Sequence, residues 1–160
     1  MGVGKTTIGR ALSKKAHLVF YDSDHEIEKQ TGVSVATIFE FEGDDGFRDR
    51  ECLMIEKLTE LDNIVLSTGG GAILADENRA VLAARGVVIY LRASINTQLS
   101  RTNQRKGTRP LLDMPDPMNK IIELDQIRAP LYASIADFTY DTDINSPLSI
   151  ADNIYNDLKL

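Results

Sequence analysis

A short glycine-rich run near the start of the chain has residue types suited to holding phosphate groups. It matches the end of the pattern G-x-x-x-x-G-K-[ST] and consists of Gly2-Val3-Gly4-Lys5-Thr6-Thr7. Glycines in such a loop let backbone N–H groups turn inward around phosphate oxygens, and the N-terminus of the following helix adds positive potential. Lys5 would reach the β- and γ-phosphates, and the Thr6 hydroxyl would bind Mg²⁺. The alternative is a plain glycine turn before an ordinary helix.

The first glycine of this pattern is missing from the sequence. It would stand five residues before Gly4, two places before Met1, and the apolar strand that leads into such a loop is absent as well. In doubly wound nucleotide-binding sheets that strand is central, so its loss would expose two strand edges. Each large buried side chain contributes about 1.5–3 kcal/mol, against a total stability of about 5–15 kcal/mol. We therefore expect the chain as written to fold poorly or to be weakly active.

Two aspartates follow a short apolar strand and suit a metal ion and an acceptor hydroxyl. Residues 18–21 are the strand, and Asp22 and Asp24 come directly after it. Sheets of α/β proteins bind ligands at the carboxyl ends of their strands, and alternation along a strand would send both carboxylates to the same side. One could support the water shell of Mg²⁺ while the other meets the hydroxyl. The alternative is a solvated turn with Asp24 as a helix N-cap.

The elements that would position these residues alternate between helical and strand patterns, which predicts an α/β fold with a parallel sheet. Ser34 and Ser146 are expected N-caps, and Pro147 is expected in the first turn of the last helix. Residues 43–46 are expected to form a turn and residues 104–117 a mobile loop. Further helices are expected over residues 4–16, 47–61, 76–86 and 118–128, and strands over 64–66, 87–91 and 138–140.

Composition narrows the class of protein. A chain of 160 residues with 42 % hydrophobic and 26 % charged residues favours one globular domain. Eighteen Lys and Arg against 24 Asp and Glu give a net charge of −6, which argues against broad nucleic-acid or membrane-surface binding. A single cysteine, Cys52, fits a reducing compartment, and no apolar run approaches the ~18 residues of a membrane span. We expect a cytoplasmic monomer.

Six stretches, in order along the chain, resemble those of the shikimate kinases. The glycine loop alone is unspecific, but the combination is specific and covers essentially the whole chain. The matching stretches are Gly-Val-Gly-Lys-Thr-Thr-Ile-Gly-Arg (2–10), Phe-Tyr-Asp-Ser-Asp (20–24), Glu-Gly-Asp-Asp-Gly-Phe-Arg-Asp-Arg-Glu (42–51), Thr-Gly-Gly-Gly (68–71), Arg-Pro-Leu-Leu (109–112) and Arg-Ala-Pro-Leu-Tyr (128–132).

The resemblance implies a three-layer P-loop NTPase fold whose parallel sheet has the strand order 2-3-1-4-5, with strand 1 absent from this chain. It implies one kinase domain over residues 1–160, with a substrate-binding subregion at about 24–62 and a lid at about 103–117. It also implies that ATP, with Mg²⁺, is used to phosphorylate the 3-hydroxyl of shikimate, in chorismate and aromatic amino-acid biosynthesis.

The resemblance further assigns roles on the acceptor side. Asp22 takes the Mg²⁺ role together with Thr6, and Asp24 binds shikimate and acts as the base. Arg48 and Arg128 bind its carboxylate, for which a planar bidentate guanidinium suits better than lysine. A triple glycine lets the backbone approach a ring hydroxyl, and it comprises Gly69, Gly70 and Gly71. The alternatives are a surface charge for Arg48, a helix-end charge for Arg128 and a plain turn for the glycines.

Three further residues match the nucleotide side of the family. Arg109 matches the lid arginine that closes over the phosphates and stabilises the transferring group. Arg101 and Pro147 fall where the family packs the adenine. The alternatives are a solvated basic loop for Arg109, a helix-face charge for Arg101 and a helix starter for Pro147.

Three other functions are the alternatives. A gluconate- or nucleotide-type kinase would share the phosphate loop but not the combination of arginines and triple glycine. A GTP-dependent switch uses Asn-Lys-x-Asp to bind guanine, whereas residues 119–122 read Asn-Lys-Ile-Ile. A non-catalytic nucleotide-binding remnant fits the incomplete phosphate loop, and titration with ATP·Mg²⁺ would distinguish it.

Overall fold

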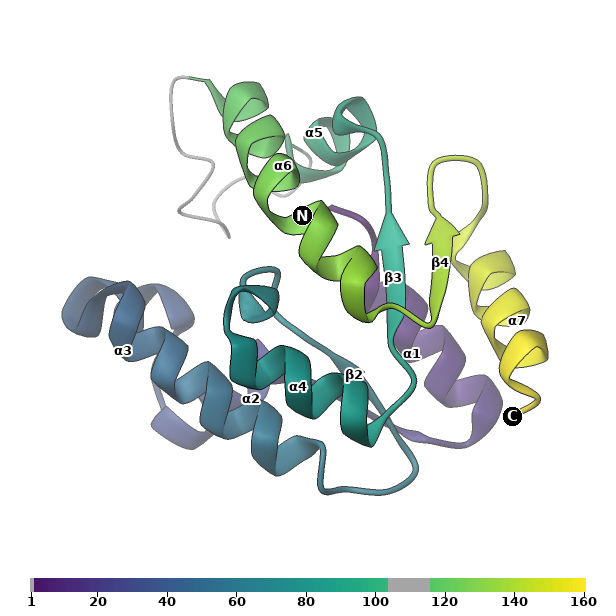
Figure 1. Ribbon diagram of the computed structural model, residues 1–160, viewed down its shortest axis with the longest axis horizontal. Helices are drawn as coiled ribbons and strands as arrows, with labels where there is room; N and C mark the ends of the chain where they lie inside the picture. The colour runs from purple at the N-terminus through teal and green to yellow at the C-terminus, as the bar shows by residue number, and fades with distance from the viewer. Residues whose placement is uncertain (1, 104–115) are drawn as a thin grey trace.

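The computed structural model describes residues 2–103 and 116–160, which form strands flanked by helices (Figure 1). The strands are β1 (Val19–Asp22), β2 (Ile64–Ser67), β3 (Ile89–Arg92) and β4 (Phe138–Asp141). The helices are α1 (Lys5–Ala16), α2 (Ser23–Thr31), α3 (Val35–Leu58), α4 (Asp76–Arg85), α5 (Ile95–Asn103), α6 (Pro117–Ile135) and α7 (Pro147–Leu158), with a short 3₁₀ helix η1 (Ala72–Leu74).

The four described strands form two parallel pairs. β1 pairs with β2, with Val19 opposite Ile64, and β3 pairs with β4, with Ile89 opposite Phe138. In this part of the chain no ladder joins β2 to β3. The pairs correspond to strands 2-3 and 4-5 of the expected order, so the predicted α/β fold with parallel strands is confirmed.

Helix α1 connects the two strand pairs through a shared hydrophobic core. Ile8 and Leu12 of α1 are buried, and Val65 of β2 and Ile89 of β3 both pack against the cluster that they form with α7. In Figure 1, α1 lies behind the strands while α4 lies in front of them. The α7 members of the cluster are Ile150, Ala151 and Ile154. The start of α1, and with it the glycine loop, is therefore fixed relative to both strand pairs.

Helices α2 and α3 pack as a second unit on the first strand pair. Their buried cluster includes Ile27, Phe47 and Met54, and Tyr21 of β1 and Leu66 of β2 pack against it. This unit occupies the predicted substrate-binding subregion. It places the N-terminus of α2 and the second half of α3 near the ends of β1 and β2.

Local signals in the sequence set several helix ends as predicted. Ser34 caps α3 by accepting a hydrogen bond from the Thr37 backbone N–H at 3.1 Å. Ser146 caps α7 in the same way, accepting from the Ser149 N–H at 3.2 Å, and Pro147 is the first residue of that helix. In the described ranges no helix is both long and apolar enough to cross a membrane.

Three local predictions were wrong. The turn expected over residues 43–46 is confined to Gly43, whose φ of 75° and ψ of −171° interrupt α3, because one left-handed glycine is enough to kink a helix. Strand alternation, which was expected to orient both Asp22 and Asp24, does not reach Asp24: β1 ends at Asp22 and Asp24 lies in the first turn of α2, where the helix dipole favours an acidic residue.

Helix α6 was expected to end at Arg128 but continues through Pro130 to Ile135. Proline in a helix removes one backbone hydrogen bond. The turn beyond it is held by Tyr132, whose ring stacks on Tyr90 of β3 at 5.1 Å between centroids. Arg128 is therefore in the body of the helix rather than at its end.

The shared core makes a stability prediction. Ile150 is 1 % exposed, so Ile150→Ala should lower the free energy of unfolding by about 2–5 kcal/mol, through lost burial and the cavity left behind. Urea unfolding followed by circular dichroism measures this. Ile144, which is 89 % exposed, is the matched control: Ile144→Ala should change stability by less than about 0.5 kcal/mol. Equal losses would contradict the packing described.

Candidate active site

The glycine loop has the backbone shape expected of a phosphate site. Gly2 and Gly4 have φ values of 70° and 93°, and Gly4 is the N-cap of α1, which begins at Lys5. A Cβ on Gly2 would lie only 2.9 Å from the carbonyl oxygen of Gln98, so the loop also packs closely on α5. Lys5 lines a cavity of about 110 Å³ with Gly69 and residues of β3.

Beside this loop, two oxygen ligands suited to Mg²⁺ lie next to each other. The Thr6 hydroxyl donates a hydrogen bond to Asp22 Oδ2 at 3.1 Å. Mg²⁺ is commonly held by one or two protein oxygens plus water and substrate phosphates, and Thr6 and Asp22 fit that pattern. Across residues 2–103 and 116–160 no cluster of three or more His, Cys, Asp or Glu side chains could hold a metal by itself.

Asp24 reaches the loop after β2 from the start of α2. A Cβ on Gly69 would lie 2.8 Å from Asp24 Oδ1 and 2.6 Å from Glu51 Oε1, so only glycine leaves room for these two carboxylates. The Gly69 N–H donates to Ser23 Oγ at 3.1 Å. Burial raises the Asp24 pKa, the Asp22 carboxylate raises it further, and Lys5 acts in the opposite direction.

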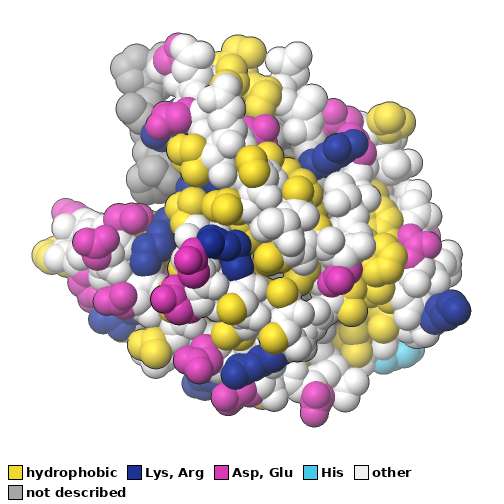
Figure 2. All heavy atoms as spheres, viewed as in Figure 1, with side chains coloured by type: hydrophobic (Ala, Val, Ile, Leu, Met, Phe, Trp, Pro, Cys, Tyr) yellow, Lys and Arg dark blue, Asp and Glu magenta, His cyan; other side chains and the backbone are white. Residues whose placement is uncertain are grey.

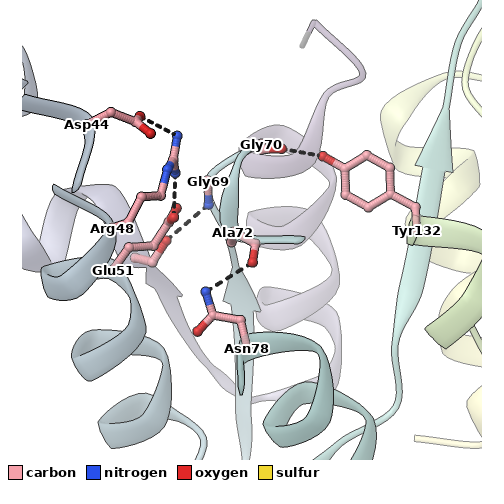
Figure 3. A network of polar contacts seen from close by, with 9 residues as sticks. Asp44, Arg48, Glu51, Gly69, Gly70, Ala72, Asn78 and Tyr132 are labelled. Atoms are coloured by element: carbon pink, nitrogen blue, oxygen red, sulfur yellow. Dashed lines mark hydrogen bonds and ion pairs between the residues drawn. The ribbon is translucent and has the colours of Figure 1, made fainter. Parts of the chain in front are cut away.

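Arg48 projects from α3 toward the same loop, as Figure 3 shows. It donates to Glu51 Oε2 at 2.5 Å and to Asp44 Oδ1 at 3.3 Å. A Cβ on Gly71 would collide with its guanidinium. Burial lowers the Arg48 pKa, but the Glu51 and Asp44 carboxylates together outweigh that effect, so the pKa is raised. Glu51 is fully buried, and burial raises its pKa despite the partner arginine.

Arg128 approaches from the opposite side, on α6. A Cβ on Gly70 would lie 3.3 Å from Arg128 Nη1, and the Arg128 side chain is buried. Within the described ranges no carboxylate forms an ion pair with it. Burial lowers its pKa. Arg128 is thus a largely desolvated cation.

These side chains converge on one place. The successive glycines after β2 face the carboxylates, then Arg128, then Arg48. In the part of the chain that the structure describes, the buried side-chain atoms without a hydrogen-bond partner are Asp24 Oδ1, Arg48 Nε, Glu51 Oε1 and Arg128 Nε. Buried polar groups are nearly always satisfied, so a cluster of unsatisfied ones marks a site for a polar ligand. Figure 2 shows the face hollowed between α3 and α6, with Lys and Arg side chains at the hollow.

On the nucleotide side, Arg101 ties the glycine loop to the loop after β4. Its guanidinium donates to the Gly2 carbonyl at 3.3 Å and to the Thr142 carbonyl at 2.6 Å. Pro147 opens α7 on the far side of that second loop. Most of the predicted lid, residues 104–115 with Arg109 among them, lies outside the described residues. The lid's predicted ends are helical, since Asn103 ends α5 and Pro117 begins α6.

Two residues of the pocket were missed at the level of sequence. Glu51 follows Arg48 by three residues, which is the spacing of a helical ion pair, but it lies among exposed acidic residues and gave no sign of burial. Tyr132 donates a hydrogen bond to the Gly70 carbonyl at 2.6 Å. It closes the Arg-Ala-Pro-Leu-Tyr stretch, four residues after Arg128, and this one-turn spacing was the available signal.

A glycine turn at a helix start, adjacent oxygen groups suited to a metal and a facing pocket of arginines and carboxylates define a P-loop kinase for a small acid. A family model described as shikimate kinase matches residues 1–159. The chain belongs to the shikimate kinase family.

Relatives and solved structures agree with this assignment. The chain is 52 % identical to a shikimate kinase of Thioalkalivibrio sulfidiphilus over 96 % of its own length and 80 % of that protein. It is 49 % identical to a shikimate kinase of Coxiella burnetii over 99 % of its length and 89 % of the relative. A solved structure of Acinetobacter baumannii shikimate kinase in complex with shikimate has a TM-score of 0.95 and 43 % identity, over 99 % of this chain and 88 % of that one.

The buried Asp24 carboxylate yields a prediction about pH and stability. Because its pKa is raised above the ordinary 3.8, the folded protein holds this proton more tightly than the unfolded chain. The stability that it contributes is complete below about pH 3.8 and is lost as the pH rises through the folded pKa. Asp24→Asn should therefore raise the urea midpoint at pH 7, with a smaller gain near pH 4.

Asp45→Asn is the matched control, since it removes the same charge from an exposed position. It should not raise the midpoint at pH 7. A midpoint for Asp24→Asn equal to or below that of the unaltered protein at pH 7 would show that Asp24 is not held in the desolvated setting described.

Proposed function

We propose that this chain transfers the γ-phosphoryl group of ATP to the 3-hydroxyl of shikimate. The observation that carries the proposal is the cluster of unsatisfied buried atoms around two arginines and the triple glycine. Shikimate has one carboxylate and three hydroxyls, so it offers an anion for the arginines and donors for the carboxylates. Membership of the shikimate kinase family supports the same acceptor.

Arg48 and Arg128 would bind the shikimate carboxylate from two sides. Arg48 is already paired with Glu51. This ion pair fixes the position of Arg48 and neutralises part of its charge. Arg128 has no such ion pair within the described ranges, and it gains most from an incoming anion because charge-assisted hydrogen bonds strengthen in a desolvated site. The backbone of Gly69, Gly70 and Gly71 would lie against the ring and its hydroxyls.

Asp24 would accept the proton of the 3-hydroxyl as the oxygen of that hydroxyl attacks the γ-phosphorus. The bond from that phosphorus to the β,γ-bridging oxygen breaks, and ADP leaves with the electron pair. A raised pKa suits a carboxylate for this task. Transfer of this kind needs positioning and charge stabilisation more than covalent help, and Lys5 would hold the β- and γ-phosphates. Thr6 and Asp22 would hold Mg²⁺, which supplies charge neutralisation at the phosphates when bound.

The remaining nucleotide contacts follow from the phosphate loop and its neighbours. The backbone of Gly2, Val3 and Gly4, with Thr7, would surround the phosphates. Arg101 and Pro147 would flank the adenine, and Arg101 is already fixed by its bonds to Gly2 and Thr142. Arg109 would close over the transferring group. A cytoplasmic location and a monomeric state stay predictions.

A substrate test separates this function from its rivals. With ATP and Mg²⁺, the protein should release ADP in the presence of shikimate but not with gluconate or nucleoside monophosphates. Calorimetric titration with ATP·Mg²⁺ should show binding, which a non-catalytic remnant would lack. Equal ADP release with gluconate, or no release with any acceptor, would contradict the proposal.

Gly71→Ala and Gly86→Ala form a matched pair for this assay. A methyl group at Gly71 would collide with the Arg48 guanidinium, whereas at Gly86 the nearest atom, the Leu82 carbonyl oxygen, is 4.0 Å away. Gly71→Ala should lower shikimate-dependent turnover at low shikimate by about ten-fold or more, because overpacking displaces the arginine. Gly86→Ala should leave turnover unchanged.

Two arginine substitutions test the assigned roles. Arg128→Ala should mainly raise the KM for shikimate, by about 10–100-fold, since it removes charged hydrogen bonds to the acceptor. Arg109→Ala should mainly lower kcat, by about 10²–10³-fold, because its charge is needed in the transition state. Steady-state kinetics with both substrates varied would show the split, and the reverse pattern would overturn the assignment.

A further inference from the structure

Tyr132 joins helix α6 to the triple-glycine loop. Its hydroxyl donates a hydrogen bond to the Gly70 carbonyl at 2.6 Å, as Figure 3 shows. Its ring stacks on Tyr90 of β3, with the planes inclined by 25°. The ring is thus held by one contact and the hydroxyl by another, so removing the hydroxyl alone would release the loop without removing the stacking.

The same glycine also faces Arg128. A Cβ on Gly70 would lie 3.3 Å from Arg128 Nη1 and 3.8 Å from the Tyr132 hydroxyl. Arg128 and Tyr132 are four residues apart on α6, which places them one above the other on one face of the helix. The Tyr132 bond therefore fixes Gly70 against the guanidinium one turn away.

The helix between these two residues needs such a fixation. Pro130 lies between them, and a proline lacks the N–H that would bond to the carbonyl four residues earlier, which bends or loosens the helix. Arg128 has no ion pair in the described ranges to hold it in place, and its Nε is unsatisfied. The backbone hydrogen bonds of α6 are thus weakened close to Arg128, the residue whose position the site requires.

We propose that the Tyr132 hydroxyl is a positioning group for the acceptor carboxylate, because it fixes the spacing between Gly70 and Arg128. This inference rests on the proposed function. The acceptor would touch Arg128 and the triple-glycine loop, and Tyr132 would act through these two. Burial raises the pKa of Tyr132 to about 12, so the hydroxyl keeps its proton and remains a donor throughout the neutral range.

Tyr132→Phe tests this role, with Tyr140→Phe as the matched control. Tyr132→Phe keeps the ring that stacks on Tyr90, and Tyr140→Phe removes a hydroxyl that donates to Asp157 at 2.6 Å, from a residue of β4 that does not line the cavity beside Lys5. Tyr132→Phe should raise the Kd and KM for shikimate about 3–10-fold, the range of one lost hydrogen bond, while kcat and the KM for ATP stay within about two-fold. Tyr140→Phe should leave all four constants unchanged.

Two further measurements separate positioning from general stability. If Tyr132 acts through Arg128, the double variant Arg128→Ala, Tyr132→Phe should bind shikimate no more weakly than Arg128→Ala alone. The methyl ester of shikimate, which lacks the carboxylate charge, should bind equally to Tyr132→Phe and to the unaltered protein. Additive losses, or equal weakening for acid and ester, would overturn the inference.

The outcomes also distinguish this inference from the function on which it rests. If the unaltered protein binds shikimate and Tyr132→Phe binds it equally well, the positioning role is wrong and the proposed function stands. If the unaltered protein binds ATP·Mg²⁺ but neither binds nor phosphorylates shikimate, both are wrong.

Discussion

The close approach of charged side chains to a loop without Cβ atoms is the constraint on which the site depends. Gly69 leaves room for Asp24 and Glu51, Gly70 for Arg128, and Gly71 for a guanidinium from α3. The carboxylates and guanidinium groups come from three different helices. A Cβ at Gly69 or Gly71 would displace the side-chain ends that approach there, and one at Gly70 would crowd Arg128, so the close approach of these charged groups depends on glycine.

This arrangement leaves charged groups buried and incompletely paired. Removing a charge from water costs several kcal/mol unless partners replace the lost hydration, and Arg128 and Asp24 each keep an unsatisfied atom. A ligand that carries an anion and hydroxyl groups would supply those partners. The folded chain therefore holds its pocket at the expense of stability, as expected where a binding site is formed before the ligand arrives.

Sequence signals predicted the features that depend on neighbouring residues, such as the caps at Ser34 and Ser146 and the glycine turn before α1. They failed where tertiary contacts decide. Asp22 and Asp24 were expected to follow the alternation of a strand, because their spacing alone cannot show that α2 begins at Ser23. Glu51 was overlooked because its burial depends on packing between α3 and the triple-glycine loop. The roles of Arg48 and Arg128 came from family resemblance, since an isolated arginine in a helix carries no specific signal.

The two strand pairs each carry one half of the site, and no described ladder joins them. The first pair bears Asp22 and the triple-glycine loop of residues 69–71, while the second supports the helices with Arg101 and Arg128. The halves are held together by the α1 core and by two side-chain bonds to backbone carbonyls, from Tyr132 to Gly70 and from Arg101 to Gly2. Phosphoryl transfer requires the acceptor oxygen to lie in line with the leaving oxygen, and an error of about 1 Å can cost about 10²-fold in rate. Because the proposed acceptor site (Asp24 and Arg128) and the proposed nucleotide site (Asp22 and Arg101) each draw residues from both halves, these few contacts would set the geometry of the reaction.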